Sequence, residues 1–383
     1  MTGRGAQAPA TVLPAERTRA RVDLGAIERN CALLKARLAD AALCAVVKAD
    51  GYGHGSLPSA NAALAGGATW LAVATAEEAV TLRDGGITGR VLVMGALTSE
   101  ELATALEAGA DVVAWTREFL ALAAAKAATA GRAARIHVKF DSGMGRLGTK
   151  SSEEALVLLG ETEHDEALEA VGLMTHFATA DDPDIAYLEY QLSRFVPIAE
   201  EAKRALPAIV VHAANSAAVL AQPATHFDMA RCGIAIYGLD PFQQDPRDHG
   251  LEPALALESY VAAVKPFASG ETAGYGRTWT ASQHTLVATL PIGYGDGYRR
   301  ALSNSAEVLI DGHRYPVVGT ISMDNTTVDV GPGTAVRVGE RATLIGCQGA
   351  ARVLAEELAR KLGTINYEIT CGLTGRVPRR YDG

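Results

Sequence analysis

The chain has 383 residues, 48% of them hydrophobic and 21% charged, and its formal net charge is −9. This composition is typical of a globular protein and excludes a collagen-like, coiled-coil or wholly disordered chain. No apolar run reaches the ~18–20 residues of a membrane-spanning helix, and an acidic chain is poorly suited to bind nucleic-acid phosphates. We therefore expect neither a membrane nor a nucleic-acid partner.

The first residues and the cysteines indicate the compartment. Residues 1–16 are rich in Ala, Pro and Gly and lack the apolar core of a secretory signal, so we expect a disordered tail. The five cysteines are dispersed and form no CxxC pair, which is typical of reduced, mostly buried thiols in a cytoplasmic protein. They are Cys31, Cys44, Cys232, Cys347 and Cys371.

Eight short apolar runs alternate with helical stretches over the first two thirds of the chain. Runs that are apolar on both faces and alternate with helices imply a parallel sheet. Eight such units in about 230 residues match the size of a (β/α)8 barrel, although a doubly wound sheet has the same local pattern. The apolar runs are 43–47, 70–74, 91–94, 111–115, 135–140, 168–174, 209–212 and 229–237, and the helical stretches are 26–38, 76–83, 100–108, 117–130 and 187–206.

After residue 250 the pattern changes to short β-branched segments separated by Gly, Pro or Asp, which are strand and turn signals. One helical stretch, 351–362, interrupts them. The expected strands are 258–264, 285–290, 306–310, 315–318, 326–330 and 341–345. We therefore expect an α/β chain, with a (β/α)8 barrel as N-terminal domain over 17–250 and a mainly β C-terminal domain over 251–383.

The strongest local signal is the segment VVKADGYGHG, residues 46–55. Its Lys48 ends the first expected barrel strand, and the active sites of such barrels are built at the carboxyl ends of the strands. The three glycines that follow allow the backbone to approach a ligand closely. Partial desolvation lowers the pKa of a lysine and makes it a nucleophile that can form a Schiff base. The ordinary alternative is a solvent-exposed lysine at a strand end.

This segment resembles the pyridoxal-phosphate (PLP) motif of bacterial alanine racemases, and nine further similar blocks follow in the family's order over nearly the whole chain after the tail. Ten collinear blocks are far more specific than any one of them. In the first domain they are KFDSGMGRLG (139–148), THFATAD (175–181), HAANSAA (212–218) and MARCGIAIYG (229–238). In the second they are GYGRTWT (274–280), PIGYGDGY (291–298), VGTISMDN (318–325), INYEI (365–369) and GRVPRRY (375–381).

The resemblance implies a PLP enzyme that interconverts L-alanine and D-alanine as a homodimer with shared active sites, supplying D-alanine for peptidoglycan. In the family, the lysine matching Lys48 holds the cofactor and acts as acid or base on one face. The tyrosine matching Tyr275 reaches over from the partner subunit to act on the other face. A phenol has a pKa of about 10 and needs nearby positive charge to act as a base. His176, with Arg231 and His212 behind it, resembles the family's chain of donors.

Arg231 is the most discriminating residue of the resemblance. Most PLP enzymes place a carboxylate against the pyridine nitrogen and keep it protonated. An arginine offers no acceptor, so it leaves that nitrogen unprotonated and limits delocalisation of the carbanion. The decarboxylases that share this barrel carry an acid there, and the arginine therefore favours a racemase.

The resemblance also implies a wider set of binding residues. Besides Lys48, His176 and Arg231, those expected to bind the cofactor are Tyr52, Arg146, Asn215, Ser216, Gly233, Ile234 and Tyr367. Those expected to bind the substrate are Arg146, Met323 and Asp324, with Lys139, His212, Tyr294 and Asp181 in supporting positions. Lys139 matches a lysine that is often carbamylated in the family, which would turn a cation into an anion able to orient Arg146.

The sequence departs from the family pattern at two positions and leaves alternatives open. Thr320 stands where many members carry an arginine near the substrate entrance, and Gly295 stands where Ala is usual.

The GxGxxG at 143–148 also matches a dinucleotide fingerprint, but no clear helix follows it and the acids at 161–166 are expected in a loop. The nine histidines show no metal-ligand spacing, so we expect no metal. A serine or broad-spectrum racemase and a PLP-carrier protein remain as rival functions.

Overall fold

The computed structural model describes residues 13–383, which form two compact units. One unit, the barrel unit, comprises Asp23–Ala254, and the other, the β unit, comprises Leu255–Asp382 together with the N-terminal segment up to Val22. Most of the expected tail, 1–12, lies outside the described residues. Of the remainder, Glu16 forms an ion pair with Arg380.

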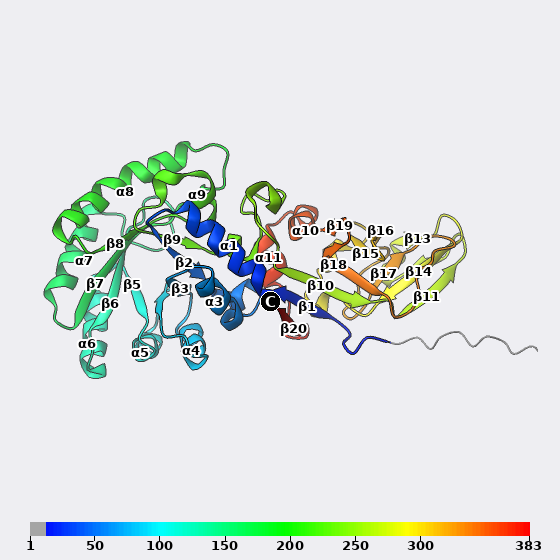
Figure 1. The fold of residues 1–383 in the computed structure, drawn as a ribbon, viewed down its shortest axis with the longest axis horizontal. Helices are drawn as coiled ribbons and strands as arrows, with labels where there is room; N and C mark the ends of the chain where they lie inside the picture. Colours follow the sequence, from blue (N-terminus) through cyan, green and yellow to red (C-terminus); the bar gives the residue numbers. More distant parts are fainter. Residues whose placement is uncertain (1–12) are drawn as a thin grey trace, which may run out of the picture. The chain divides into compact units, whose positions relative to one another are not determined.

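Eight parallel strands close into a barrel, as expected, so the doubly wound alternative is wrong (Figure 1). Every one of the eight apolar runs forms a barrel strand, and nearly all of their residues are buried because helices cover the outside. The last run is shorter than expected: after Cys232 the backbone leaves the strand conformation at Gly233, and Ile234–Tyr237 form a 3-10 helix. The strands are β2 (Ala42–Val46), β3 (Trp70–Val73), β4 (Arg90–Val93), β5 (Asp111–Ala114), β6 (Ala134–Lys139), β7 (Leu168–Met174), β8 (Val210–His212) and β9 (Met229–Cys232).

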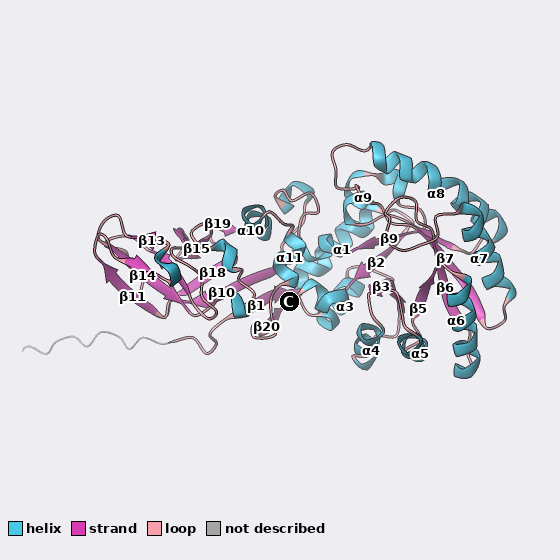
Figure 2. Ribbon diagram, turned by 180° about the vertical axis from the view of Figure 1, so that it is seen from behind, coloured by secondary structure: helices cyan, strands magenta, loops and turns pink. Residues whose placement is uncertain are grey.

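Helices surround this barrel (Figure 2). Several begin at side-chain caps: Thr75 and Thr98 each form a capping box, and Ser151 accepts the N–H of Glu154. The last of these corrects the sequence expectation of a loop at 161–166, because Ser151 starts a helix whose apolar face is buried and which ends only at His164. The helices are α1 (Leu24–Arg37), α3 (Ser56–Ala65), α4 (Ala76–Asp84), α5 (Ser99–Glu107), α6 (Arg117–Ala130), α7 (Ser152–His164), α8 (Ala186–Ala205) and α9 (Ser216–Ala221).

The β unit is built from antiparallel strands in a larger sheet, a three-stranded sheet and a two-stranded ribbon. The larger sheet has the order β16-β15-β18-β10-β1-β20, with β19 paired to β18, and the smaller one the order β11-β14-β17. The strands are β1 (Arg19–Asp23), β10 (Leu255–Tyr260), β11 (Ala263–Phe267), β12 (Thr272–Ala273), β13 (Trp279–Thr280), β14 (Thr285–Leu290), β15 (Glu307–Ile310), β16 (His313–Pro316), β17 (Thr326–Asp329), β18 (Arg341–Gln348), β19 (Ala351–Val353) and β20 (Arg379–Asp382).

Three features of the β unit differ from expectation. Residues 19–22, expected in the barrel domain, pair with β10 and belong to the β unit. The expected helix 351–362 starts only at Ala355, as α10 (Ala355–Leu362), because a turn at Gly349 with positive φ folds 351–353 back onto β18 as β19. A second helix, α11 (Asn366–Cys371), was not expected.

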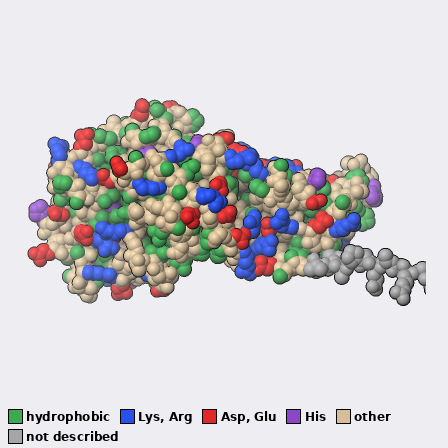
Figure 3. All heavy atoms as spheres, in the orientation of Figure 1, with side chains coloured by type: hydrophobic (Ala, Val, Ile, Leu, Met, Phe, Trp, Pro, Cys, Tyr) green, Lys and Arg blue, Asp and Glu red, His purple; other side chains and the backbone are tan. Residues whose placement is uncertain are grey.

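The surface and the thiols complete the description. Basic and acidic side chains are intermixed over the face drawn in Figure 3. Within residues 13–383, no helix is both long and apolar enough to cross a membrane. In the described part of the chain the five cysteines form no disulfide; three are buried, and Cys347 and Cys371 are exposed.

Candidate active site

The residues expected at the barrel site lie at or just after the carboxyl ends of their strands. Lys48 follows β2, Lys139 ends β6, His176 follows β7, His212 ends β8, and Arg231 lies in β9. In a closed parallel barrel these ends meet at one mouth. The pKa of Lys139 is consistent with such a meeting of strand ends. Burial first, and then the charges of Arg231, Arg146 and Lys48, lower this pKa to about 8. The mouth therefore gathers several cationic side chains, of which Lys139 and Arg231 are buried.

Lys48 precedes a strained turn. Ala49, Asp50, Gly51 and Tyr52 all have left-handed φ angles, of 52°, 51°, 61° and 52°. Each non-glycine residue in this conformation costs roughly 1–2 kcal/mol. Side-chain acceptors hold the turn: Glu78 Oε1 accepts the Ala49 N–H at 2.6 Å, and Asp50 Oδ1 accepts the N–H of residue 56 at 3.0 Å. Strain held in this way is typical of functional sites.

Tyr52, Ser216 and Gly233 form a compact set of polar groups at the mouth. Asn215 caps α9 by accepting the Ala218 N–H at 3.0 Å, and this places Ser216 at the start of the helix. Ser216 Oγ accepts the backbone N–H groups of Gly233 and Ala235 at 3.1 and 3.3 Å. A Cβ at Gly233 would overlap the Tyr52 hydroxyl, so only glycine leaves room for this contact. Hydroxyls and successive backbone N–H groups of this kind can form an anion cradle.

Arg231 is 4% exposed, and no carboxylate is among its hydrogen-bond partners in the described chain. Its Nη1 donates to His212 Nδ1 at 2.8 Å, and its Nη2 donates to His176 Nδ1 at 3.2 Å and to two backbone carbonyls. Burial lowers the pKa of Arg231 to about 10, which leaves it charged at neutral pH. Burial, and then the Arg231 charge, hold the pKa of His176 and of His212 well below its usual value, so both imidazoles are neutral.

The loop that carries Arg146 is organised by residues that the sequence analysis missed. Asp141 accepts the N–H groups of Gly143 and Gly145, and no helix begins until Ser152, so the GxGxxG segment does not open a dinucleotide-binding helix. Gln191 on α8 donates to the carbonyl of His176 at 3.1 Å and to the hydroxyl of residue 142 at 3.1 Å. It thereby joins the Arg146 loop to the end of β7. Arg146 itself is exposed.

Two buried polar residues behind the mouth were also missed. His137 Nδ1 lies 2.8 Å from His212 Nε2, and His137 Nε2 lies 3.4 Å from Asp111 Oδ2. Both belong to expected barrel strands, and a polar residue within an otherwise apolar strand was the available signal. Asp181, expected in a supporting position, is exposed in the loop after β7.

The remaining expected residues belong to the β unit, where several are exposed. Tyr275, Met323 and Tyr294 are 73%, 50% and 40% exposed, which is unusual for large apolar side chains. The Tyr294 N–H donates to the carbonyl of residue 322, which joins the Tyr294 and Met323 loops. The other two are Asp324, which pairs with Arg376 at 2.6 Å, and Tyr367, which is half-buried on α11.

Thr320, where many family members carry arginine, is turned into the β unit. It is 7% exposed, and its hydroxyl lies 3.2 Å from that of Thr278, three residues after Tyr275. Gly274 allows the two segments to approach, because a Cβ there would come within 2.9 Å of the Thr320 nitrogen. The threonine therefore packs the Tyr275 segment and places no positive charge on the surface.

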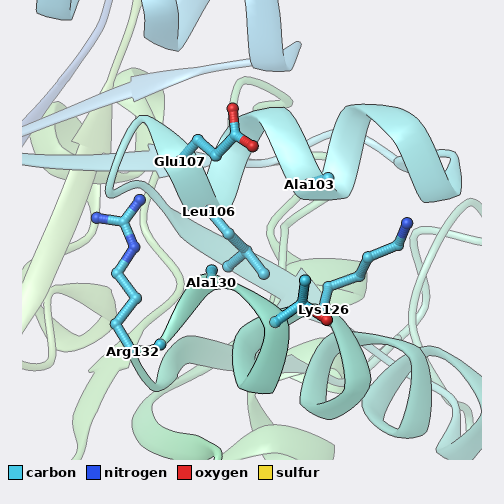
Figure 4. A pocket seen from close by; sticks show the side chains of 8 residues that line it. Ala103, Leu106, Glu107, Lys126, Ala130 and Arg132 are labelled. Atoms are coloured by element: carbon cyan, nitrogen blue, oxygen red, sulfur yellow. The ribbon is translucent and has the colours of Figure 1, made fainter.

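A hollow of about 600 Å³ lies elsewhere, between α5 and α6 on the outside of the barrel (Figure 4). None of the expected site residues lines it; its charged side chains are Glu107, Lys126 and Arg132. Across residues 13–383, no group of three or more His, Cys, Asp or Glu side chains is arranged to hold a metal ion. The hollow is therefore separate from the expected site residues at the barrel mouth.

The chain is similar to known proteins of one family. The chain matches the N-terminal domain of alanine racemase over residues 22–241 and its C-terminal domain over residues 254–381. It is 43% identical to the alanine racemase of Symbiobacterium thermophilum over 369 residues, covering 96% of this chain and 97% of that protein. It is 44% identical to that of Mycolicibacterium vanbaalenii, covering 97% and 96%.

Solved structures give the same result. The crystal structure of alanine racemase from D-cycloserine-producing Streptomyces lavendulae superposes with a TM-score of 0.91 at 36% identity, covering 97% of this chain and 98% of that one. That from Streptomyces coelicolor also has a TM-score of 0.91, at 39% identity, covering 95% and 98%. The chain belongs to the alanine racemase family and is an isomerase.

Proposed function

We propose that the chain interconverts L-alanine and D-alanine with pyridoxal phosphate, using Lys48 and Tyr275 of the partner subunit as its two acid–base groups. The single observation that carries the proposal is Arg231, a buried guanidinium at the barrel mouth with no carboxylate beside it. A guanidinium cannot keep a pyridine nitrogen protonated as a carboxylate does. The arrangement supports proton transfer at Cα and disfavours reactions that need a stronger electron sink.

The residues of the mouth fit pyridoxal phosphate. Tyr52, Ser216 and the backbone N–H of Ile234 offer donors for a phosphate, and Gly233, whose N–H donates to Ser216 Oγ, leaves the space that a Cβ would take from the Tyr52 hydroxyl. Lys48 offers the amine for the aldehyde, and Arg231 a donor for the ring nitrogen. When bound, this cofactor supplies an electron-withdrawing ring that acidifies the substrate Cα–H. Tyr367 and Asn215 are proposed to support the same cradle.

The two bases need different surroundings. Lys48 lies at the mouth near Lys139, and its charge acts on the Lys139 amine. Tyr275 needs a neighbour that stabilises its phenolate. Because His176 Nδ1 accepts from Arg231, its proton is on Nε2, and we propose that this N–H donates to the Tyr275 oxygen of the partner subunit. The high exposure of Tyr275 in the β unit supports a role against a second copy of the chain, and hence a homodimer.

The substrate carboxylate requires donors of its own. We propose the Arg146 guanidinium and the backbone N–H of Met323 for this task, with Asp324 beside it and with Asp181 and Tyr294 at the entrance. Tyr367 limits the space for the substrate side chain and favours alanine over serine or larger amino acids. D-alanine for peptidoglycan and a cytoplasmic location are the corresponding proposals for its role in the cell.

The test is a visible spectrum and a product assay. The purified protein should show the absorption of lysine-bound pyridoxal phosphate and should racemise L-alanine faster than L-serine or L-lysine. Lys48→Ala should lose both the absorption and the activity. A protein that stays colourless when the cofactor is added would sink the proposal, and a preference for L-serine would replace alanine as the substrate. The presence of the second domain argues against a simple cofactor carrier.

A further inference from the structure

A line of four hydrogen-bonded side chains crosses the barrel interior behind the site. From Arg231 Nη1 it runs to His212 at 2.8 Å, from His212 to His137 at 2.8 Å, and from His137 to Asp111 at 3.4 Å. Asp111 begins β5 and His212 ends β8, so the line reaches from the amino ends of the strands to the mouth. The two histidines and Asp111 are 0% exposed. These groups therefore depend on one another for their hydrogen bonds.

Donor and acceptor roles along the line follow from its two ends. The Arg231 guanidinium can only donate, so His212 Nδ1 accepts and the proton of His212 is on Nε2. His212 Nε2 then donates to His137 Nδ1, which leaves the proton of His137 on Nε2, facing Asp111. Burial lowers the pKa of both histidines, so each carries only this one proton. All the hydrogen bonds point in one direction, from the cation to the carboxylate.

The barrel is built to make room for this line. A Cβ at Gly172 on β7 would overlap the His137 ring, so glycine is required opposite it. The β6–β7 pairing shifts register between Ile136 and His137, which sets His137 directly opposite Gly172. Register shifts of this kind re-aim side chains next to active sites. The Trp70 ring packs edge-on against His137, with 5.6 Å between the centroids.

Asp111 is held as a carboxylate at the far end. Arg135 Nε lies 2.5 Å from Oδ1, and Arg90 Nη1 lies 3.2 Å from Oδ2. Burial acts to raise the pKa of Asp111, but the hydrogen bond to His137 and the neighbouring cations outweigh it and leave the pKa below its ordinary value. The line thus ends in the negative charge of Asp111. Arg231 has no carboxylate among its hydrogen-bond partners in the described chain and is connected to this charge through His212 and His137.

We propose that His137 and Asp111 are positioning residues of the racemase site. They hold His212 with its proton on Nε2, so that its Nδ1 accepts from Arg231 and fixes the charged guanidinium beside His176. The proposal rests on the proposed function, since Arg231 and His176 act there on cofactor and phenol. The hydrogen bonds of one chain polarise each other in a low-dielectric interior. Loss of the His137 hydrogen bonds should therefore weaken the hold on Arg231, although His137 contacts Arg231 only through His212.

A matched pair of variants separates the hydrogen bonds from the packing. His137→Gln keeps both functions, because its amide oxygen can accept from His212 and its amide nitrogen can donate to Asp111. His137→Leu keeps a similar side-chain volume but can neither accept from His212 nor donate to Asp111. Asp111→Asn keeps one acceptor oxygen for His137, removes the charge and replaces the second acceptor oxygen, which faces an arginine, with an NH2 donor. We expect His137→Leu to lower kcat for alanine about tenfold or more with a smaller change in KM, and His137→Gln to retain kcat within about threefold.

A second readout needs no turnover. In holoenzyme labelled with ¹⁵N-histidine, the nitrogen resonances of His212 and His137 should each show a protonated Nε2 and an unprotonated Nδ1. In His137→Leu and Asp111→Asn the His212 resonances should shift, whereas thermal unfolding, run in parallel, reports any loss of packing.

The outcomes are distinct. Equal kcat for wild type and His137→Leu, or a protonated Nδ1 on wild-type His212, would overturn the inference. If the variants fail to fold, the wild-type resonances alone decide it. A wild-type holoenzyme that does not racemise alanine would instead overturn the proposed function, and the catalytic role of the line with it.

Discussion

Lys139 shows how the barrel mouth changes the chemistry of a single residue. Burial first, and then Arg231 and Arg146, lower its pKa from the ordinary 10.5 to about 8. Because the folded state disfavours the charged amine, this group's unfavourable contribution to folding is fully present below about pH 8. It disappears as the pH rises to about 10.5. A partly neutral amine is also the form that reacts with carbon dioxide.

We therefore expect Lys139 to form a carbamate. Its Nζ would bond to the carbon of CO2 and release one proton, leaving an anion among Arg231 and Arg146. Protein equilibrated with ¹³C-bicarbonate should show a carbamate carbon signal that grows with pH through about 8, where the amine loses its proton. Lys139→Ala, the control, should lack the signal. An unlabelled wild-type Lys139 under bicarbonate would contradict the expectation.

Tyr275 is the residue for which the two directions of the reaction should differ. Tyr275→Phe keeps the ring and removes the proton-transferring oxygen, so proton exchange from one enantiomer should slow by about a hundredfold or more. Exchange from the other enantiomer, started by Lys48, should slow less. Deuterium incorporation from solvent into L-alanine and D-alanine, measured separately, tests this. Tyr294→Phe is the control, and equal slowing of both enantiomers would argue against two bases.

Residues at strand ends could be located from the sequence, whereas residues inside the barrel could not. Lys48 and His176 lie just after apolar runs, so their positions can be inferred from the local sequence; Arg231 lies inside the expected run 229–237, and its family match identified it. His137 and Asp111 lie within runs, and their partner His212 is on a distant strand. Which inward side chains meet depends on closure of the barrel and on the register shift at His137, neither of which the local sequence contains.

At the scale of elements, the turn after Lys48 depends on a helix that follows the next strand. Glu78, on α4, accepts the N–H groups of Ala49, Ala74 and Thr75 at 2.6, 2.7 and 3.2 Å. It therefore joins the start of α4 to the strained turn. We expect Glu78→Ala to lower the free energy of unfolding by about 1–3 kcal/mol, since three backbone N–H groups, two of them part-buried, lose a charged acceptor.

The loss should also loosen Lys48, and so weaken binding of pyridoxal phosphate in a titration of apoenzyme. The neighbouring Glu77→Ala is the matched control, because Glu77 is exposed and a change there should stay within about 0.5 kcal/mol. Equal stability and equal cofactor affinity in both variants would show that Glu78 does not support the turn.

The barrel strands were predictable as elements because apolar runs buried on two faces have a distinctive pattern. The missed elements have other causes. Strand β1 pairs with β10 and β20, which lie far along the chain. Strand β19 was taken as helix because the turn at Gly349, and not the composition of 351–353, decides its conformation.

At the scale of the whole molecule, the proposed sharing of active sites between two subunits makes a prediction about mixed dimers. Lys48→Ala and Tyr275→Phe subunits are each expected to form inactive homodimers. In a mixed dimer, one site would combine both substitutions and the other would be intact. Random mixing in equal amounts should thus restore about a quarter of the wild-type activity, since half of the dimers are mixed and one of their two sites works. No recovery after subunit exchange, verified by tagged copies, would mean that both bases come from one chain.

The position of β1 has a consequence for synthesis. The strand leaves the ribosome before the barrel, yet both its neighbours in the sheet, β10 and β20, come after the barrel. During synthesis, β1 therefore stays unpaired until the barrel residues that follow it have been translated. The sheet of the β unit, which carries Tyr275, is complete only after β20 has been synthesised. A chain whose translation stops early would therefore have a complete barrel mouth but an incomplete unit to present Tyr275 to a partner subunit.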